Sequence, residues 1–525
     1  MAVVTYTNAV NFNDYFLPGL FVFDALDPNL DPLVTTSATR MELTAPGAAG
    51  LSTIVATGTG FTYFVDASTG DQGAPLSGIV DTVTLSINGQ LWMTISGLSV
   101  ALTDLVHFMF GWEDRGQYRP GNGFDLFSLF LAGNDTINGS AGDDDLADGF
   151  NTGNDLINAG GGSDFIMADA GNDTINGGGG SDMYSLSQTH WDGSAYRGAN
   201  VNLATGRALD SWGGTDTLSS IERVEGSRMS DRFTGSDAGE QFGGLRGNDT
   251  INGGGGIDLV RYDWDARWGG NAAVNVNLTT GIATDGWGNT DRLVNIEDVI
   301  GTNRSDTIVG NLRDNLIIGG AGVDVINGGA GRDTADFWTP DVLNGAIVNL
   351  SLTTNQVQND GFGNRETLVS IENLNGTSLA DNLTGNRLAN RISGYDGNDT
   401  INGGAGNDTL VVGRGFDQLT GGTGADVFVF DGLFVLGDAG GGSWGPVITD
   451  FRSGIDTLVS AWSTEPLRFQ NGTSAGTAGE AWFYFDGATN RLFWDADGIG
   501  GAAAYLVVTL TGVNQLAASD FEFWG

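Results

Sequence analysis

The stretch AGGGSDFIMADAGNDTINGGGGSDMYS, residues 159–185, consists of three nine-residue lines laid end to end. Asp164, Asp173 and Asp182 lie nine residues apart, each closely preceded by glycine, and a bulky residue follows two positions after each acid. Glycine permits turns with φ > 0 and leaves the backbone carbonyls unobstructed. The segment x-U-x after each acid, with U apolar, predicts a short strand whose middle side chain points inward. Each line is therefore expected to form a tight loop followed by a three-residue strand.

Such lines recur in four blocks along the chain, and a longer period lies over the short one. Asp249, Asp324 and Asp399 are 75 residues apart, and the spacers between the blocks repeat with the same step. Self-similarity of this kind predicts a repeat architecture in which no single line can bury an apolar face alone. The expected domains are an N-terminal assembly or cap domain at 1–130, a first block at 131–185, three 75-residue units at 186–425 and a C-terminal cap at 426–525.

The composition indicates that a cation takes part in folding. The formal net charge is −42, only 11 of the 64 acidic residues are Glu, and all 22 basic residues are Arg. Such acidity argues against nucleic-acid partners, and the absence of lysine excludes a Walker A loop and Schiff-base chemistry. With no cysteine there are no disulfides, and no apolar run is long enough to span a membrane. The 13 Trp, 28 Phe and 10 Tyr argue against a disordered chain.

The cation that suits these lines is calcium. A carboxylate is a hard anionic oxygen ligand, and Ca²⁺ takes six to eight oxygens at about 2.3–2.6 Å. Two lines would make one coil of a flattened parallel helix, with apolar residues inside and roughly ten or more Ca²⁺ ions along both edges. The expected fold is all-β: a parallel β-roll (β-helix) solenoid of G-G-x-G-x-D-x-U-x repeats in several blocks, flanked by β-rich terminal domains.

The candidate calcium ligands are the acids at the sixth position of the lines and the glycines of the most complete loops. The acids are Asp135, Asp144, Asp155, Asp164, Asp173, Asp182, Asp231, Asp249, Asp258, Asp306, Asp324, Asp333, Asp381, Asp399, Asp408, Asp417 and Asp426. The glycines are Gly160, Gly162, Gly178, Gly180, Gly254, Gly256, Gly320, Gly322, Gly329, Gly331, Gly404, Gly406, Gly422 and Gly424. Glu240, Asn315 and Asn390 stand at the Asp position in lines that lack most glycines, so these coils are expected to stack without a full calcium site.

With many near-complete nonapeptides in phase, the array resembles the RTX (repeats-in-toxin) calcium-binding proteins of Gram-negative bacteria. That resemblance implies a secreted, extracellular protein exported through type I secretion machinery by an uncleaved C-terminal signal. The N-terminus has no positive side chain before Arg40, as expected without an N-terminal signal peptide. The last hundred residues look like the C-terminal β-roll cap and secretion region of serralysin-type proteins, and the chain ends in acid and aromatic residues at 520–524.

No catalytic motif is found. The serralysin relatives carry an H-E-x-x-H zinc motif, which this chain lacks; His107 is expected to be a packed histidine and His190 a spacer-loop residue. Two G-x-S-x-G matches are expected by chance in a chain with 86 Gly. Glu222, Glu297 and Glu372 repeat in the three spacers, which favours a structural role at the re-entry into each roll.

The terminal regions carry other secondary-structure signals. Residues 52–65 and 81–95 alternate as strands do, the second turning at Asn88 and Gly89, and a helix is expected over 102–112. Residues 481–498 and 503–513 are also strand-like. Trp212, Trp287 and Phe362 recur in polar spacer loops, where they could stack on sugar rings or plug a gap against the roll.

These observations favour an extracellular structural protein, such as a surface-layer, filament or matrix component, that folds and self-associates on binding Ca²⁺. The array dominates the chain, and its ends look like interfaces. The alternative is a secreted polysaccharide-active enzyme or carbohydrate-binding protein, for which a cell-surface polysaccharide is the expected partner. A pore-forming toxin is disfavoured, because hydrophobic insertion segments and lysines are missing.

Overall fold

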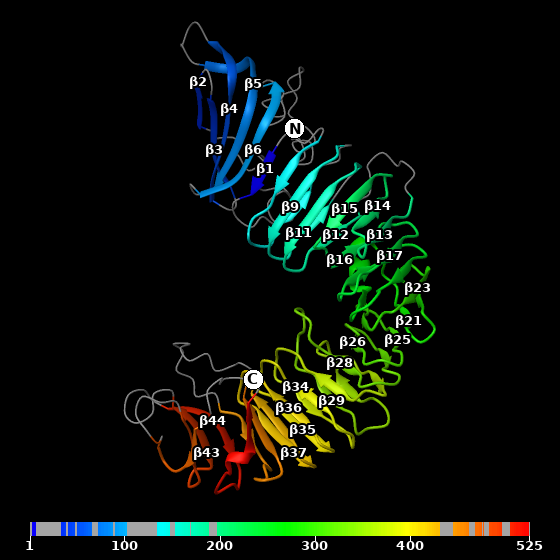
Figure 1. The fold of residues 1–525 in the computed structure, drawn as a ribbon, viewed down its shortest axis with the longest axis vertical. Coiled ribbons are helices and arrows are strands. Elements are labelled where there is room, and N and C mark those ends of the chain that lie inside the picture. The colour runs from blue at the N-terminus through cyan, green and yellow to red at the C-terminus, as the bar shows by residue number, and fades with distance from the viewer. Residues whose placement is uncertain are drawn as a thin grey trace. The chain divides into compact units, whose positions relative to one another are not determined.

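The computed structural model describes residues 3–6, 33–37, 40–47, 50–65, 72–87, 90–101, 134–147, 153–167, 170–187, 197–430, 445–460, 468–474, 476, 482–495 and 504–523. The chain divides into two compact units, Met1–Asp258 and Leu259–Gly525. Each unit is built almost entirely of short strands (Figure 1).

The nonapeptide line folds as its pattern predicts. In β7 (Thr136–Asn138) and β10 (Phe165–Met167) the middle side chain is buried and its neighbours are partly exposed. Successive lines alternate between two faces, so a strand pairs in parallel with the strand two lines later. Ile175, for example, pairs with Ile157 eighteen residues earlier. Two lines therefore make one coil, and the apolar residues stack inside it.

The first face of unit 1 continues from the nonapeptides into the spacer. Its strands are β7, β9 (Leu156–Gly161), β11 (Thr174–Gly179), β13 (Asn200–Asn202), β14 (Arg207–Leu209), β15 (Thr215–Ser219), β17 (Arg232–Thr234) and β19 (Thr250–Asn252). The second face consists of β8 (Asp145–Ala147), β10, β12 (Met183–Ser185), β16 (Arg223–Glu225) and β18 (Gln241–Gly243).

The spacers are part of the solenoid. β15 pairs in parallel with β11, and β13 pairs in parallel with β17. Between these two pairings the chain makes an antiparallel meander, β13–β14–β15. The spacer thus adds a wider coil and keeps the parallel stack continuous, so the 75-residue period is one structural unit.

The N-terminal strands form an antiparallel sheet joined to the roll. They are β1 (Val3–Tyr6), β2 (Leu33–Ser37), β3 (Arg40–Gly47), β4 (Gly50–Val65), β5 (Gln72–Ile87) and β6 (Gln90–Ala101). β5 and β6 pair with Ile87 opposite Gln90, which confirms the hairpin expected around residues 88 and 89. β1 pairs with β6 on one side and in parallel with β7 on the other, so this sheet runs into the first coil.

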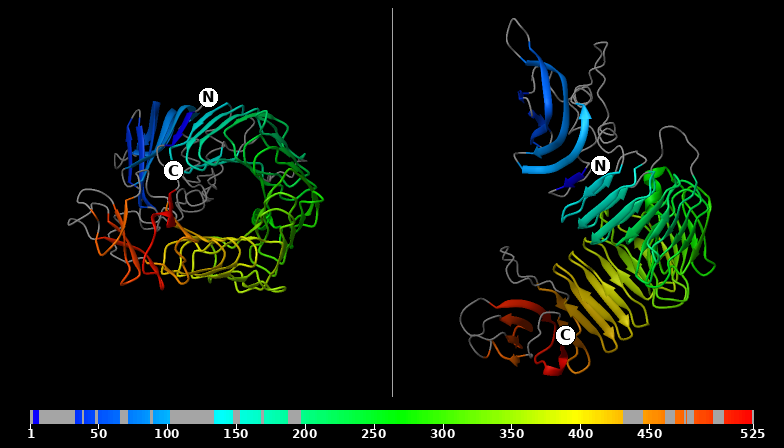
Figure 2. Two further views of the ribbon diagram at one scale, coloured as in Figure 1. Left: turned by 60° about the horizontal axis from the view of Figure 1, so that its bottom comes forward. Right: turned by 45° about the horizontal axis from the view of Figure 1, so that its top comes forward.

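Unit 2 is also a roll with two faces (Figure 2). One face carries β21 (Asn275–Asn277), β22 (Ile282–Thr284), β23 (Thr290–Val294), β25 (Thr307–Val309), β27 (Val325–Asn327) and β31 (Thr367–Val369), and then β29 (Ile347–Asn349), β30 (Val357–Asn359), β33 (Asn382–Thr384), β35 (Thr400–Ala405), β37 (Gln418–Thr423) and β39 (Val447–Ile448). The other carries β20 (Leu259–Arg261), β24 (Asp298–Ile300), β26 (Leu316–Ile318), β28 (Thr334–Asp336), β32 (Asn373–Asn375), β34 (Arg391–Ser393), β36 (Thr409–Val412), β38 (Val427–Phe430), β40 (Thr457–Ser460) and β45 (Phe521–Phe523).

The C-terminal region extends both faces of unit 2. An antiparallel set of β42 (Trp482–Asp486), β43 (Arg491–Asp495) and β44 (Tyr505–Leu510), with β41 (Phe469–Asn471) parallel to β42, joins the roll because β44 pairs with β39. β45 pairs with β40 on the other face. Two 3₁₀ segments, η2 (Asp263–Trp268) and η3 (Ala518–Asp520), complete the described structure.

The predicted all-β solenoid of parallel nonapeptide strands is confirmed, as are the predicted strands around residues 52–65, 481–498 and 503–513. The helix expected at 102–112, His107 and His190 lie outside the described residues. In the described part of the chain, no helix has the length and apolarity needed to cross a membrane.

Candidate metal centre

The aspartates of successive coils are linked into ladders along the two edges of the roll. In many rungs the backbone N–H of the acid donates to Oδ1 of the aspartate one coil later, which is eighteen residues away in the regular coils. These N···O distances are 2.9 Å from Asp164 to Asp182, 2.9 Å from Asp381 to Asp399 and 3.0 Å from Asp399 to Asp417. One carboxylate oxygen of each rung is therefore used to hold the preceding coil.

The second oxygen is buried without a hydrogen-bond partner in many rungs. Among the described residues this holds for Oδ2 of Asp155, Asp164, Asp173, Asp182, Asp324, Asp333, Asp399, Asp408 and Asp417. Leaving a buried charged oxygen without a donor is costly. A row of such atoms therefore indicates a ligand that supplies positive charge.

In many lines a glycine five residues before the acid makes room for this oxygen. A Cβ at Gly403 would lie 2.5 Å from Oδ2 of Asp408, and one at Gly319 would lie 2.5 Å from Oδ2 of Asp324. The predicted ligand set contains the glycines four and two residues before the acid but not this first one. The signal was present, because the first G of G-G-x-G-x-D is that position.

All fourteen glycines selected from the sequence have positive φ, from 89° at Gly320 to 150° at Gly322. They also allow coils to stack closely: a Cβ at Gly404 would lie 2.5 Å from the carbonyl oxygen of Asn386 in the coil before. The loops thus bring backbone carbonyls and carboxylates together at each edge of the roll. Glycine adopts the left-handed backbone conformation of these loops with little steric penalty.

This donor set fits Ca²⁺. The ion prefers carboxylate and backbone carbonyl oxygens, and it tolerates irregular geometry. No group of three or more His, Cys, Asp or Glu side chains suited to a metal occurs in the described segments. The ligands other than one or two carboxylates would therefore be loop carbonyls. When bound, the ion supplies the positive charge that the buried carboxylates lack.

Burial raises the pKa of the ladder carboxylates. The pKa of Asp164 and of Asp173 is raised from 3.8 to about 7, and that of Asp399 to about 8. Loss of hydration is the main cause; hydrogen bonds from the backbone N–H of the preceding rung oppose it, and neighbouring aspartates add to it. The ionised form therefore needs a nearby cation at neutral pH.

Spacer acids end ladders of the preceding block, two in the first spacer and one in the third. The N–H of Asp173 donates to Oδ1 of Asp216 at 2.9 Å, and the N–H of Asp182 donates to Oε2 of Glu222 at 2.9 Å. In the third unit the N–H of Asp333 donates to Oε2 of Glu372 at 3.0 Å. Glu222 and Glu372 thus have the structural role expected from their repetition. Asp216 was missed, because Gly214 precedes it at the usual spacing but Ser211 and Trp212 replace the first two glycines of the line.

The aromatic spacer residues sit in loops closed by an aspartate. Oδ1 of Asp285 accepts from the N–H of Trp287 at 2.9 Å, and Oδ1 of Asp360 accepts from the N–H of Phe362 at 2.9 Å. Trp212, Trp287 and Phe362 are all partly exposed. The six-membered ring of Trp287 lies beside Gly270, so this side chain packs on the fold as well as facing solvent.

Other predicted ligands have carboxylates already bonded within the protein. Oδ2 accepts from the N–H of the residue four earlier in Asp144, Asp231, Asp306 and Asp381, at 2.6, 2.7, 2.6 and 2.8 Å. The lines of Glu240, Asn315 and Asn390 also receive this N–H bond, at 3.1, 2.8 and 2.8 Å. The structure therefore separates two kinds of line within the predicted set.

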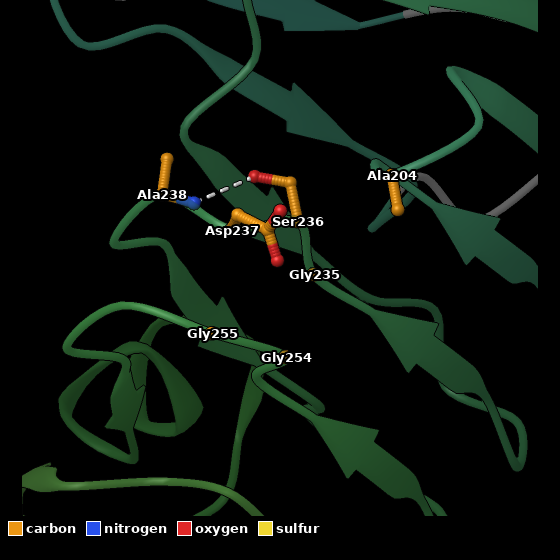
Figure 3. A pocket seen from close by; sticks show the side chains of 7 residues that line it. All are labelled: Ala204, Gly235, Ser236, Asp237, Ala238, Gly254 and Gly255. Carbon is orange, nitrogen blue, oxygen red and sulfur yellow. Dashed lines mark hydrogen bonds between the residues drawn. The ribbon is translucent and has the colours of Figure 1, made fainter.

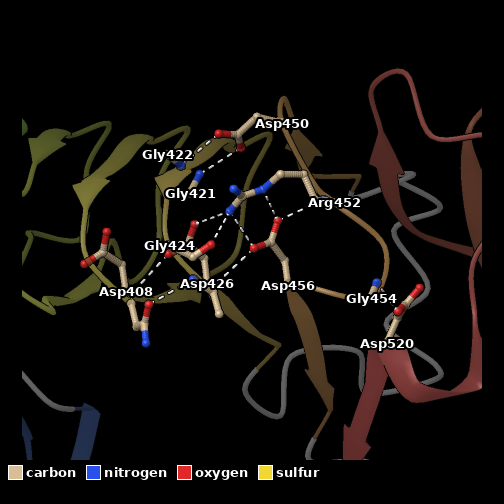
Figure 4. A network of polar contacts seen from close by, with 12 residues as sticks. Asp408, Gly421, Gly422, Gly424, Asp426, Asp450, Arg452, Gly454, Asp456 and Asp520 are labelled. Carbon is tan, nitrogen blue, oxygen red and sulfur yellow. Dashed lines mark hydrogen bonds and ion pairs between the residues drawn. The ribbon is translucent and has the colours of Figure 1, made fainter.

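An arginine stands at the end of one ladder (Figure 4). The Arg452 guanidinium donates to the carbonyl oxygen of Gly424, contacts Oδ2 of Asp426 at 3.4 Å and Oδ1 of Asp456 at 2.9 Å. The N–H of Asp426 in turn donates to Oδ1 of Asp456 at 3.1 Å. The Oδ2 atom of Asp426, which the sequence predicts to be a calcium ligand, thus lies beside the positively charged guanidinium group of Arg452.

A shallow hollow lies beside the line of Glu240 in unit 1 (Figure 3). It is lined by Ala204, Gly235, Ser236, Asp237, Ala238, Gly254 and Gly255. Asp237 is its single ionisable side chain, and the Ser236 hydroxyl accepts from the N–H of Ala238 at 3.0 Å. This hollow offers no pair of groups for acid–base chemistry.

The profile of the RTX calcium-binding nonapeptide repeat matches residues 131–147, 151–184, 226–264, 300–335, 375–410 and 403–432. No curated protein sequence matches the chain significantly.

Among solved structures, the AlgE6R3 subunit of the Azotobacter vinelandii mannuronan C5-epimerase is 29% identical, with 27% of this chain and 78% of that chain covered and a TM-score of 0.19. The AlgE6R2 subunit of the same epimerase is 28% identical, covering 28% and 89%, with a TM-score of 0.22. Extracellular lipase LipA from Serratia marcescens is 14% identical, covering 74% and 40%, with a TM-score of 0.17. The nonapeptide profile matches the blocks that form these coils. The chain therefore carries several copies of the RTX calcium-binding repeat, which fold as β-rolls and bind Ca²⁺.

Proposed function

We propose that the protein is a secreted, extracellular structural component that folds when its lines bind Ca²⁺ and then self-associates into a layer, filament or matrix. The observation that carries the proposal is the recurrence of buried aspartate oxygens without a hydrogen-bond partner, as in Asp164, Asp182, Asp399 and Asp408, which require a cation. The parallel stack of strands runs through the spacers, so the repeat array is the main body of the described structure.

Calcium would make folding depend on location. With a Kd of about 10⁻⁴ M and roughly millimolar calcium, each site contributes about 1.4 kcal/mol to the stability of the folded state. At submicromolar calcium this contribution vanishes, and coils that stabilise only their neighbours lose it together. The chain is then unfolded inside the cell and folded outside it, as export through type I secretion machinery requires.

The ends of the array suit assembly. β1 joins the antiparallel N-terminal sheet to the first coil, and β44 and β45 continue the two faces at the other end. We propose that residues 1–130 serve as an assembly or cap domain and residues 426–525 as the C-terminal cap with the secretion signal.

A second candidate function is carbohydrate binding, for which a cell-surface polysaccharide is the partner. It is favoured by the three partly exposed aromatic side chains, Trp212, Trp287 and Phe362, which recur once per unit at closed polar loops. Aromatic rings of this kind provide apolar faces on which a sugar ring can lie.

Circular dichroism and light scattering on one sample of the full chain test the proposal. Millimolar calcium should convert a coil spectrum into a β spectrum and give large assemblies that EDTA dissolves, whereas magnesium at the same concentration should do neither. A folded monomer that never associates would contradict the structural role and direct attention to sugar binding. An unchanged spectrum would contradict calcium-driven folding itself.

A further inference from the structure

The two kinds of line differ in the backbone state of the residue four before the acid. In five lines with a buried, unbonded Oδ2, this residue is a glycine with positive φ: Gly160, Gly178, Gly320, Gly329 and Gly404 precede Asp164, Asp182, Asp324, Asp333 and Asp408. The line of Asp417 is an exception, because Gly413 does not have positive φ. Tyr395 adopts the same conformation, with φ 60°, before Asp399. We call these the open lines.

In the closed lines of Asp231, Asp306 and Asp381 the same position is occupied by a serine or threonine that bonds to the acid twice, through its N–H and its hydroxyl. The N–H of Thr377 donates to Oδ2 of Asp381 at 2.8 Å, and the Thr377 hydroxyl donates to Oδ1 at 2.8 Å. Thr302 and Asp306 have the same pair of bonds, at 2.6 and 3.0 Å. Both oxygens of the carboxylate are thus bonded to donors of its own loop.

A third donor comes from the spacer. Oδ1 of Asp381 accepts from the N–H of Ala346 at 2.5 Å, and Oδ1 of Asp306 accepts from the N–H of Val274 at 2.8 Å. A carboxylate that accepts several hydrogen bonds is stabilised in its charged form by them. The closed carboxylates therefore have a set of donors where the open ones have a buried oxygen without any.

The partner lines of these coils replace the acid with asparagine. Nδ2 of Asn315 donates to the carbonyl oxygen of Glu297 at 2.6 Å, and Nδ2 of Asn390 donates to that of Glu372 at 2.6 Å. An amide NH₂ group is a donor only, so it cannot ligate a cation. Each amide group thereby also takes up a backbone carbonyl oxygen of the preceding coil as its hydrogen-bond acceptor.

We propose that the closed lines hold no calcium and that the protein's own donors take the place of the ion, so that the second and third 75-residue units each pair a metal-free coil with a metal-binding coil. In the last unit the metal-free coil carries Asp381 and Asn390, and the metal-binding coil carries Asp399 and Asp408. Arg452 closes the final rung in the same way with a guanidinium group. The proposal rests on calcium binding by the repeats and is independent of self-association.

A matched pair of substitutions on one edge of the roll tests this assignment. Asp381 and Asp399 are consecutive rungs linked by the hydrogen bond from the N–H of Asp381 to Oδ1 of Asp399. Asp399→Asn should lose at least one bound Ca²⁺ per chain, whereas Asp381→Asn should keep the full number, counted by native mass spectrometry of the full chain. Loss of an ion from Asp381→Asn, or none from Asp399→Asn, would overturn the proposal.

The reverse change adds a site. The variant carries four substitutions in the loop at 377–380: Thr377→Gly, Ser378→Ala, Leu379→Gly and Ala380→Asn. They replace TSLA with GAGN, the sequence of the open loop at 404–407. This variant should bind at least one more Ca²⁺ than the parent chain, and the control Thr377→Ser, which keeps both donors, should bind the same number. An unchanged count, or a chain that no longer folds in calcium, would contradict the proposal, since the chain already folds this loop three lines later.

Discussion

The coils of Asp381 and Asp399 lie next to each other, share one hydrogen-bond ladder and bury their apolar residues equally, yet they satisfy their carboxylates in different ways. Asp399 keeps a buried oxygen without a donor, whereas Asp381 receives two bonds from Thr377 and one from Ala346. The comparison indicates that each buried carboxylate of the β-roll needs compensation for its negative charge. We propose that a bound ion provides this compensation at Asp399 and that hydrogen bonds from the protein provide it at Asp381.

The largest effect should follow from removing calcium at different pH values. The pKa of Asp164 is raised to about 7 and that of Asp399 to about 8 by burial, so between about pH 4 and pH 8 the metal-free folded chain binds more protons than the unfolded chain. Protonation therefore stabilises the metal-free fold at low pH, and this contribution is lost as the pH rises through these values.

In EDTA the chain should consequently show more β structure at about pH 5 than at about pH 8, measured by circular dichroism. In calcium the difference should shrink, because the ion replaces the protons. A metal-free chain that is more folded at pH 8 than at pH 5 would contradict the assignment of these carboxylates.

The next effect concerns the core, which the two kinds of coil share. Ile392 in β34 follows Asn390, and Ile401 in β35 follows Asp399; both side chains are buried. Ile392→Ala and Ile401→Ala should each lower the free energy of unfolding by about 2–5 kcal/mol at saturating calcium. Urea denaturation measures both, and a cost below about 1 kcal/mol for either variant would show that its coil is not packed as described.

Much of this could be predicted from the sequence. The nonapeptide period is long enough to fix the strand, the inward residue and the loop, because each of these depends on residues within one line. The calcium ladder follows for the same reason, since Gly178 and Asp182 stand in the same positions as Gly404 and Asp408. The 75-residue repeat also showed that the spacer acids are structural.

The remaining features depend on contacts between lines. Asp216 takes part in the ladder through the N–H of Asp173, forty-three residues away, and its line lacks the first two glycines of the pattern. Whether a line is open depends on the backbone at one position, and Tyr395 adopts the left-handed conformation although its residue type does not predict it. The sequence grouped Asp306 and Asp381 with the calcium ligands because the donors that close them are ordinary Thr and backbone groups.

The smallest effect should come from the donor that closes a line. Thr377→Val removes the hydroxyl that donates to Asp381 at 2.8 Å and accepts from the N–H of Leu379 at 3.0 Å. We expect a loss of about 1–2 kcal/mol in the free energy of unfolding with no change in calcium affinity. Thr400→Val, at an exposed position in β35, is the control and should change stability by less than about 0.5 kcal/mol. A weaker calcium affinity in Thr377→Val would contradict a metal-free role for this line.

The most direct test of the account is a calcium anomalous difference map from crystals of the full chain grown in calcium. The account predicts peaks beside the carboxylates of Asp324, Asp333, Asp399 and Asp408, and none beside Asp306, Asn315, Asp381 or Asn390. Peaks at the closed lines, or none at the open ones, would contradict it.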